Sequence, residues 1–209
     1  MKVEVLPVTP FQQNCSIIIC EETKKAAIVD PGGEVDRIKE KLVQLGVTPE
    51  KILITHAHID HAGGTADLAE ALSLPIEGPQ KEDSFWIEKL ADQSRMFQFP
   101  EAKPFEPDRW LNHSDNVTVG NLKFEVRYCP GHTPGHVVFI NHENKLIWVG
   151  DVLFRGSIGR TDFPRGDHAT LIKSITDNLL SLPDDYQFIS GHGPISSIGV
   201  ERSSNPFIN

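Results

Sequence analysis

The sequence predicts one α/β domain in which two β-sheets are covered by helices. Apolar runs of strand length fall into two groups, one near the amino terminus and one in the second half of the chain. Segments with helical spacing lie between and after these groups. The 209 residues suffice for one large domain or two small ones. Because no internal repeat, low-complexity tract or clear linker separates the elements, we expect a single domain over residues 1–209.

The amino-terminal part begins with three predicted strands rich in β-branched residues. Four polar residues between the second and third strands fit a hairpin turn, so we expect the three strands to be antiparallel neighbours. Their ranges are Lys2–Val8, Ser16–Cys20 and Lys25–Val29.

A helix, a fourth strand and a shorter helix follow. Apolar residues recur at helical spacing over residues 35–45, and Gly46 stands where a helix is expected to end. The strand is predicted over Lys51–Thr55 and the shorter helix ends before Pro75.

The second half of the chain returns to strands. One long helix is predicted over Lys81–Phe97, and the proline-rich segment Pro100–Pro107 is expected to form a loop over one face. The remaining predicted elements are strands at Val117–Val119, Leu122–Tyr128, Val137–Ile140 and Leu146–Val149, a helix at Leu171–Leu179 and a last strand at Phe188–Ile189.

Charge and cysteine content exclude several classes of function. A net charge of −9 argues against a nucleic-acid partner and against a polybasic membrane anchor. The amino terminus lacks the pattern of a secretory signal, and no apolar run reaches membrane-spanning length. Three cysteines are too few for a disulfide framework. We therefore expect a cytoplasmic protein that acts on a small molecule, and the oligomeric state stays open.

The segment Thr55–Gly64 concentrates three imidazoles and a carboxylate directly after an apolar run. In an extended chain alternate side chains share a face, so His56 and His58 can point the same way. A turn at Asp60 and His61 can aim that second pair into a neighbouring space, and one short segment can then serve two adjacent metal ions. The alternative is a solvated loop rich in histidine. It is the weaker interpretation, because a strand or helix gains nothing from such a cluster without a metal.

Three further predicted strands end in small residues next to histidine or aspartate. These strand ends carry His132, Asp151 and His192. Rigid scaffolds place catalytic groups on loops at strand ends, and small neighbours let the backbone approach a metal closely. The three residues are therefore candidate metal ligands as well.

The order of these residues resembles the pattern of the metallo-β-lactamase superfamily, and the likeness extends over nearly the whole chain. It implies a four-layered αβ/βα sandwich with two metals at one edge between the sheets. It also implies that Asp60 and Asp151 are the catalytic carboxylates. The implied ligands are His56, His58 and His132 for the first ion, Asp60, His61 and His192 for the second, and Asp151 bridging both.

The chemistry of such a site predicts hydrolysis. Imidazole and carboxylate ligands suit two divalent ions, Zn(II) above all, with Fe or Mn as alternatives. Two such ions, two aspartates and a bridging hydroxide would leave a charge of about +1 at the site. A metal lowers the pKa of bound water to about 7, so that a metal-bridging hydroxide can attack a carbonyl at neutral pH. A thioester is the favoured substrate because its thiolate leaving group binds such metals well.

Three segments are similar to glyoxalase II-like hydrolases, which cleave S-lactoylglutathione to lactate and glutathione. These segments are Thr9–Cys15, His132–His136 and Gly156–Phe163. A common class of β-lactamases has cysteine where this chain has Asp151, which argues against antibiotic hydrolysis. Because only a short tail follows His192, the chain resembles the short, single-domain members without the C-terminal helical domain that binds glutathione.

Arg160 lies where the long form of these hydrolases has a basic residue that contacts the substrate. The resemblance therefore implies that Arg160 anchors a carboxylate of an anionic thioester, with Arg155 and Arg165 as weaker candidates.

Three other functions compete with this interpretation. A persulfide dioxygenase of the same superfamily shares a Gly-Arg-Thr-Asp-Phe segment and uses one iron at positions matching His56, His132 and Asp151. A processing nuclease conflicts with the negative charge of the chain. A non-enzymatic zinc-binding module conflicts with a set of seven filled ligand positions.

Several further residues allow two interpretations. His136 and Asp30 either support the metal ligands or merely stand at strand ends. Cys129 is expected to be a small buried hydrophobe rather than a ligand. His142 is expected to be solvated, and Trp86 to serve packing rather than stacking against a ligand.

Overall fold

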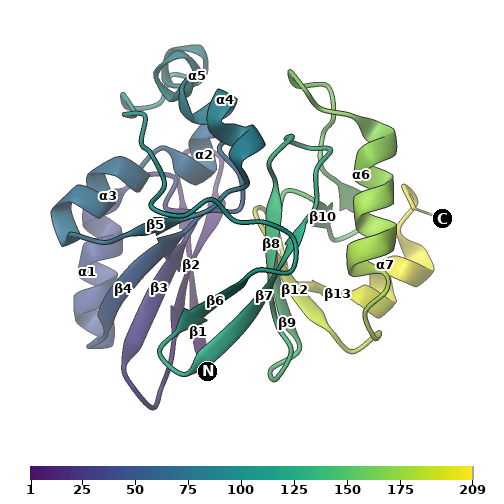
Figure 1. Ribbon diagram of the computed structural model, residues 1–209, viewed down its shortest axis with the longest axis horizontal. Coiled ribbons are helices and arrows are strands. Elements are labelled where there is room, and N and C mark those ends of the chain that lie inside the picture. Colours follow the sequence, from purple (N-terminus) through teal and green to yellow (C-terminus); the bar gives the residue numbers. More distant parts are fainter. Residues whose placement is uncertain (209) are drawn as a thin grey trace.

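Two β-sheets pack face to face at the centre of the molecule, and helices cover the outer face of each sheet (Figure 1). The computed structural model describes residues 1–208. The layers follow the order helix, sheet, sheet, helix, which confirms the predicted αβ/βα sandwich.

The first sheet joins an antiparallel amino-terminal meander to two strands that run parallel to its last member. Helices α1 (Val35–Leu45) and α3 (Thr65–Leu72) form the crossovers between the parallel strands and pack on the outer face of the sheet. In order across the sheet the strands are β1 (Lys2–Val8), β2 (Gln13–Ile19), β3 (Lys25–Val29), β4 (Thr48–Leu53) and β5 (Ile76–Glu77).

The second sheet is an antiparallel meander extended by one parallel strand. Helix α6 (His168–Ser174) and the π-helical turn η2 (Ile175–Leu179) cross from its fourth strand to the parallel one. In order across the sheet the strands are β13 (Ser196–Ser197), β12 (Gln187–Ser190), β9 (Leu146–Gly150), β8 (Val137–Asn141), β7 (Leu122–Tyr128) and β6 (Asn116–Val119). Helix α7 (Ile198–Ser204) follows β13.

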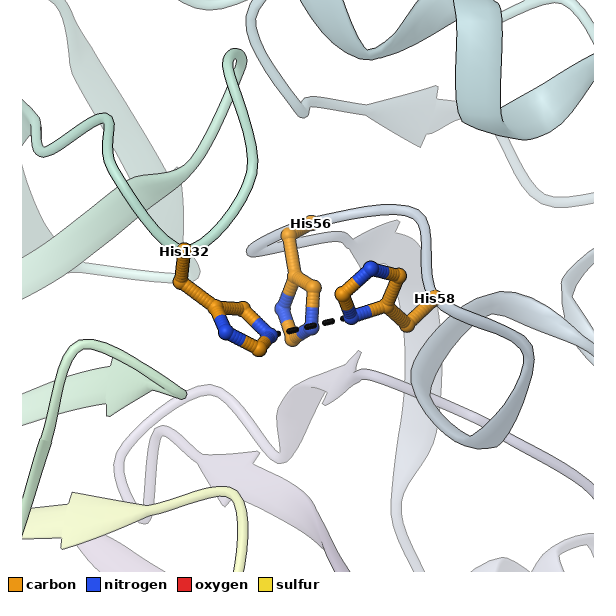
Figure 2. Close-up of side chains that lie close together, drawn as sticks. All are labelled: His56, His58 and His132. Carbon is orange, nitrogen blue, oxygen red and sulfur yellow. Dashed lines mark hydrogen bonds between the residues drawn. The ribbon is translucent and has the colours of Figure 1, made fainter. Parts of the chain in front are cut away.

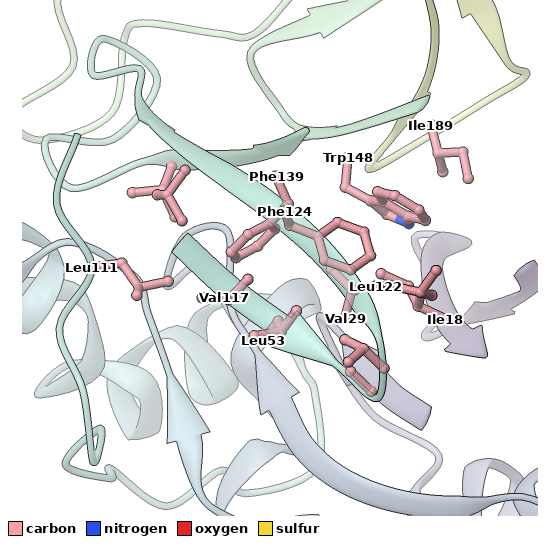
Figure 3. Close-up of a cluster of buried hydrophobic side chains, with 14 of the residues drawn as sticks. Ile18, Val29, Leu53, Leu111, Val117, Leu122, Phe124, Phe139, Trp148 and Ile189 are labelled. Carbon is pink, nitrogen blue, oxygen red and sulfur yellow. The ribbon is translucent and has the colours of Figure 1, made fainter. Parts of the chain in front are cut away.

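Alternation along the central strands decides which layer each side chain contacts. In β8, Val137 and Phe139 join the core between the two sheets, whereas Val138 and Ile140 join the core beneath α6 and η2. Figure 3 shows the inter-sheet core, where the rings of Phe124 and Phe139 lie close to other large apolar side chains. Each such fully buried side chain stabilises the fold by about 1.5–3 kcal/mol. This core holds the two sheets at the fixed spacing that a site between their edges requires.

The strand predicted over Lys51–Thr55 ends earlier than expected, at Leu53. The Asp30 carboxylate accepts the backbone N–H of Thr55 at 2.7 Å and so takes the place of a ladder partner. His56 and His58 therefore lie in a loop rather than on an extended strand. The predicted turn at Asp60 and His61 is instead the short helix α2 (Ile59–Ala62).

The single helix predicted over Lys81–Phe97 is wrong, because this segment is broken into three pieces. The chain bends at Glu88 and Lys89, so that Asp83, Trp86 and Gln93 all reach the histidine loop, which one straight helix could not achieve. The pieces are η1 (Lys81–Asp83), α4 (Ser84–Ile87) and α5 (Leu90–Phe97).

Four short strands and one helix were not predicted from the sequence. The strands β5, β13 and the hairpin pair β10 (Leu153–Phe154) and β11 (Ser157–Ile158) have two residues each, too few for any periodic signal. Helix α7 lies in the short tail after His192, for which no element was predicted. The Ser197 side chain caps it by accepting the backbone N–H of Val200. No helix within residues 1–208 has the length and apolar character needed to cross a membrane.

Candidate metal centre

Three histidines from the two halves of the molecule meet at the upper edge of the sheets. His56 and His58 come from the loop after β4, and His132 comes from the loop after β7 in the other sheet (Figure 2). Nδ1 of His58 lies 2.9 Å from Nε2 of His132, and one nitrogen of each of the three rings falls within 4.8 Å of the others. This three-histidine cluster is fully buried.

A second cluster consists of Asp60 and His61 from α2 and His192 from the loop after β12. The His192 Nε2 lies 3.0 Å from Oδ2 of Asp60, and Nε2 of His61 lies 3.8 Å from the same oxygen. One ligand atom from each residue again falls within 4.8 Å of the others. We call this group the acidic cluster.

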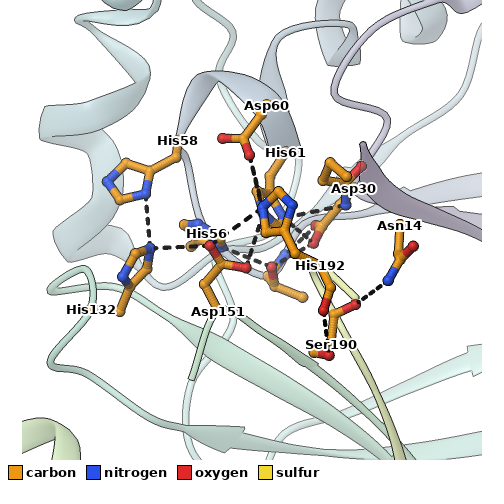
Figure 4. A network of polar contacts seen from close by, with 12 residues as sticks. Asn14, Asp30, His56, His58, Asp60, His61, His132, Asp151, Ser190 and His192 are labelled. Atoms are coloured by element: carbon orange, nitrogen blue, oxygen red, sulfur yellow. Dashed lines mark hydrogen bonds and ion pairs between the residues drawn. The ribbon is translucent and has the colours of Figure 1, made fainter. Parts of the chain in front are cut away.

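Asp151, which directly follows β9, stands between the two clusters (Figure 4). Its Oδ1 lies 3.2 Å from Nε2 of His61, and its Oδ2 lies 3.6 Å from Nε2 of His132 and 3.7 Å from Nε2 of His192. The structure therefore brings together all seven residues that the sequence singled out, with Asp151 in the central place.

Backbone carbonyl groups orient two of the histidines. Nδ1 of His132 donates to the carbonyl of Arg160 at 2.7 Å, and Nδ1 of His192 donates to the carbonyl of Phe11 at 3.1 Å. A carbonyl can only accept, so each ring carries a proton on Nδ1 and turns Nε2 toward its cluster. There Nε2 of His132 lies 2.9 Å from Nδ1 of His58, and Nε2 of His192 lies 3.0 Å from Oδ2 of Asp60.

The Asp30 carboxylate orients two more. It accepts Nδ1–H of His61 at 2.9 Å and the hydroxyl of Thr55 at 2.6 Å, and that hydroxyl oxygen lies 3.1 Å from Nδ1 of His56. Asp30 could meet His56 and His61 in a metal site, but its oxygens are already occupied by these bonds. Of the two interpretations open for Asp30, the structure supports the role behind the candidate ligands.

His136 also lies directly behind the cluster. Its ring stacks on His56 with centroids 4.6 Å apart, and its Nε2 accepts the backbone N–H of Asp151 at 3.1 Å. Through this hydrogen bond His136 holds the start of the loop that presents Asp151. On the other side of Asp151, Gly191 has no room for a side chain, because an added Cβ would lie 2.1 Å from Oδ1 of Asp151.

Asp83, which no local sequence pattern singled out, ties the two histidine loops together. This buried carboxylate accepts the N–H of Ala57 at 2.9 Å, the hydroxyl of Thr133 at 2.9 Å and the N–H of Gly135 at 2.6 Å. Burial raises its pKa to about 7, although these hydrogen bonds oppose the shift. Asp83 therefore links the loop of His56 and His58 to the loop of His132.

Two buried or half-buried amides hold the remaining loops. The side-chain oxygen of Gln93 accepts the N–H of Ile59 at 2.9 Å, and its nitrogen donates to the carbonyl of Trp86 at 3.0 Å. The side-chain nitrogen of Asn14 donates to the carbonyl of Ser190 at 3.0 Å, on the loop that carries His192. Neither residue could be found from local sequence, because its partners lie 34 and 176 residues away.

The structure also tests the expectations for Cys129, Trp86 and His142. Cys129 is buried, and burial raises the pKa of its thiol to about 12, as expected for a small hydrophobe. Trp86 packs against His58 with centroids 4.7 Å apart and also lines the cavity described below. The expectation for His142 is only partly right, because this half-exposed ring bonds to Glu125 at 2.6 Å and to the Tyr186 hydroxyl at 2.9 Å.

The two clusters differ in their protonation. Burial, reinforced by neighbouring imidazoles, holds the pKa of His56 and of His58 well below the usual 6.5, and burial also lowers the pKa of His132. Burial opposes charge at His61 too, but the carboxylates of Asp151 and Asp60 raise its pKa well above the usual value. The three-histidine cluster is therefore neutral, whereas the acidic cluster holds an imidazolium beside its carboxylates.

The donor atoms fit metal ions. Nε2 of His56, Nε2 of His61 and Oδ1 of Asp151 are buried and lack a hydrogen-bond partner among the described residues. The latter two lie 3.2 Å apart, within ion-pair range but without hydrogen-bond geometry. Buried polar atoms are seldom left unpaired, and imidazole with carboxylate is a donor set that Zn, Fe and Mn accept. Both clusters could therefore hold a metal.

A cavity of about 910 Å³ opens over the two clusters. Its walls include aromatic rings from the β1–β2 turn, from α4 and α5, and from the segment after β9. Arg160 lies at its rim and is exposed, but its guanidinium forms a two-pronged ion pair with Asp162, with N–O distances of 2.9 and 2.7 Å. The predicted anchor is thus at the cavity, with its charge already paired.

Comparisons with known proteins agree with this fold. The sequence model of the metallo-beta-lactamase superfamily matches residues 8–192. The hydroxyacylglutathione hydrolase GloC of Haemophilus influenzae is 47% identical over 210 residues, which cover all of this chain and 99% of that protein.

Three solved structures are also similar. The BLEG-1 B3 metallo-beta-lactamase is 35% identical, with a TM-score of 0.91 and 99% of each chain covered. TTHA1623, solved in a di-iron-bound form, is 36% identical with a TM-score of 0.89, covering 98% of this chain and 99% of that one. ETHE1 from Myxococcus xanthus is 26% identical with a TM-score of 0.82, covering 99% of this chain and 84% of that one.

Proposed function

The chain belongs to the metallo-beta-lactamase superfamily, and within that family we propose that it is a binuclear metal-dependent hydrolase of thioesters. The observation that supports this most strongly is the place of Asp151. One of its carboxylate oxygens faces His61, and the other lies between His132 and His192. A carboxylate so placed can contribute to both clusters at once, as a pair of metal ions sharing one ligand requires.

Each residue has a role in this proposal. His56, His58 and His132 hold one ion, Asp60, His61 and His192 hold the other, and Asp151 joins them. Metal ions bound there would acidify water and polarise the thioester carbonyl. We assign Zn as the favoured metal, with Fe or Mn as alternatives.

The protein's own groups prepare this chemistry. The hydrogen bonds from Nδ1 of His132 and His192 to backbone carbonyls hold the rings in place and make Nε2 the nitrogen that would bind a metal. The buried setting strengthens every electrostatic contact with the developing negative charge on the carbonyl oxygen. Asp60 and Asp151 are the carboxylates nearest the reacting atoms.

We propose S-lactoylglutathione, or a related anionic glutathione thioester, as the substrate. The similarity to a protein named hydroxyacylglutathione hydrolase supports this choice. Arg160 at the cavity rim would bind a substrate carboxylate by exchanging Asp162 for it. The single domain over residues 1–209 would supply every residue named in this proposal.

The direct test is thioester hydrolysis by metal-defined protein. Thiol release from S-lactoylglutathione is followed while the metal content per chain is measured on the same samples. We expect activity to rise with the second equivalent of metal. Activity that is complete with one equivalent, or no thiol release at any loading, would contradict the proposal.

A mononuclear iron persulfide dioxygenase is the second candidate, favoured by the segment Gly159–Phe163, which such enzymes share. An oxygen electrode beside the hydrolysis assay distinguishes the two. Oxygen uptake with glutathione persulfide by protein carrying one iron per chain would replace the hydrolase assignment.

Hydrolysis of β-lactams is a third candidate because BLEG-1 is 35% identical over almost the full chain. The same metal-defined protein can be assayed with a chromogenic cephalosporin. Turnover of that compound above the rate for the thioester would make the β-lactam the better substrate.

A further inference from the structure

Aromatic rings flank the candidate metal centre on two sides. Beside the three-histidine cluster, the rings of Trp86 and Phe163 lie 4.7 and 4.8 Å from the ring of His58, centroid to centroid. Beside the acidic cluster, Phe154 lies 6.2 Å from His192. All three line the cavity. An acyl group placed in the cavity beside either cluster therefore has an aromatic ring near it.

Most polar groups of the cavity wall are already engaged. The side-chain oxygen of Gln93 accepts the N–H of Ile59, and its side-chain nitrogen donates to two backbone carbonyls. The carboxylate of Asp92 is paired with Arg95, and the guanidinium of Arg160 is paired with Asp162. Each of these groups would have to give up an existing contact to bind a small hydroxyacyl group. That loss is costly for the buried amide of Gln93 and small for the exposed ion pairs of Asp92 and Arg160.

Two positively charged side chains of the cavity wall have no ion-pair partner among the described residues. Neither Lys89 nor Arg155 has a carboxylate oxygen within 4.0 Å in the described part of the chain, and both are exposed. Lys89 lies over the ring of Phe85 at 4.2 Å, and Arg155 occupies the turn between β10 and β11. The cavity wall thus combines aromatic rings beside both clusters with two exposed cations that have no ion-pair partner within residues 1–208.

On the premise of the proposed function, we propose that the native substrate is an anionic thioester with an aromatic or similarly bulky hydrocarbon acyl group. The rings of Trp86, Phe154 and Phe163 receive this acyl group, and Lys89 and Arg155 receive the anionic end of the thiol. The reaction needs only water, whose oxygen joins the acyl carbon while the C–S bond breaks and the thiol leaves with a proton. Lactoyl, with its single methyl group, would leave much of the aromatic surface uncovered.

Two glutathione thioesters that differ only in the acyl side group test the proposal. S-mandeloylglutathione carries a phenyl group where S-lactoylglutathione carries a methyl group, and the hydroxyl and the thiol are the same. We expect kcat/KM to be about 10–100-fold higher for the phenyl compound, since a few extra apolar carbons in a fitting pocket are worth that much. Equal values, or a preference for lactoyl, would overturn the proposal.

Variants locate the effect in the aromatic wall. Phe154→Ala should reduce the preference for the phenyl compound several-fold by lowering its kcat/KM more than that of the methyl compound. Phe207→Ala is the matched control, because Phe207 is 52% exposed and lies outside the cavity. An unchanged preference in Phe154→Ala would show that this ring does not contact the acyl group.

A binding measurement separates this inference from the hydrolase assignment. S-benzylglutathione and S-methylglutathione are thioethers that cannot be hydrolysed, and their dissociation constants for metal-loaded protein can be measured by calorimetry. We expect the benzyl compound to bind at least about tenfold more tightly. If neither thioester is cleaved but this difference holds, the hydrolase assignment fails and the preference for a bulky hydrocarbon stands. If both thioethers bind alike, the inference fails even when hydrolysis is observed.

Discussion

The three-histidine cluster and the acidic cluster lie side by side, yet the protein builds them differently. The first is fully buried and neutral, and its two loops are tied to each other by Asp83. The second contains His192, whose side chain is 30% exposed, and it satisfies its own charges through ion pairs with Asp60 and Asp151. The three-histidine cluster therefore offers neutral ring nitrogens that are already in position. In the acidic cluster a metal must first displace existing ion pairs.

This difference predicts unequal metal affinities. A cation entering the three-histidine cluster meets neutral nitrogens that are already positioned, so little reorganisation is needed. A cation entering the acidic cluster must first displace the proton of His61, whose pKa is raised by Asp151 and Asp60 against the effect of burial. We expect the first cluster to bind metal more tightly and the second to depend more strongly on pH.

The largest effect on activity and metal content is expected at Asp151, the residue that contacts both clusters. Asp151→Ala should lower kcat by about three orders of magnitude or more and loosen both metals, because within residues 1–208 no other carboxylate lies within 4.0 Å of histidine nitrogens from both clusters. Metal content after dialysis and single-turnover hydrolysis measure the two effects. Asp185→Ala, which removes an exposed carboxylate paired with Lys145, is the control. Loss of metal from only one cluster would argue against a bridging role.

Removing the Asp83 link should weaken one cluster and spare the other. Asp83→Ala leaves the N–H groups of Ala57 and Gly135 without their acceptor, so the affinity of the three-histidine cluster should fall about 10–100-fold. Competition with a chelator should then release one metal per chain early and the other at the usual concentration.

Asp83→Asn keeps one acceptor oxygen and should fall between the wild type and the alanine variant. Asp92→Ala, in the same helical segment but exposed and paired with Arg95, should leave both metals unaffected. Equal weakening of both clusters in Asp83→Ala would mean that the loss is a general destabilisation of the fold.

Lowering the pH should increase the difference in metal affinity between the two clusters. The pKa values of His61 and His192 are raised, against the effect of burial, by the neighbouring carboxylates, so both rings bind protons at a pH above the usual 6.5. Protons therefore compete for the acidic cluster first as the pH falls. The histidines of the other cluster have lowered pKa values and should keep their metal to a lower pH. Metal per chain measured across a pH series should fall in two steps, and a single step would contradict the comparison.

The smallest effects should come from the rim, outside both clusters. Arg160→Ala and Arg155→Ala should each raise KM for an anionic thioester by about 2–10-fold with little change in kcat, because exposed charge contacts are worth about 1 kcal/mol. Arg155 has no ion-pair partner to lose among the described residues, so its removal should have the larger effect. An unchanged KM in Arg160→Ala would remove the anchor role predicted for it.

Much of the fold could be read from the sequence because its central strands carry strong local signals. The strands Lys2–Val8, Lys25–Val29 and Leu122–Tyr128 occur with the predicted bounds, and the predicted helix end at Gly46 is confirmed by its left-handed backbone, with φ of 62°. The broken helical segment after Lys81 could not be read, because its bends serve contacts with a loop some 30 residues earlier rather than any local preference.

For the site, the sequence by itself singled out the seven side chains that the structure brings together, since a run of histidines and aspartates at strand ends has few other uses. Only the tertiary structure decided that Asp83 joins two loops and that aromatic rings line the cavity beside both clusters. These are relations between segments brought together by packing of the two sheets. No local pattern encodes them, because the partners are neighbours in space and not along the chain.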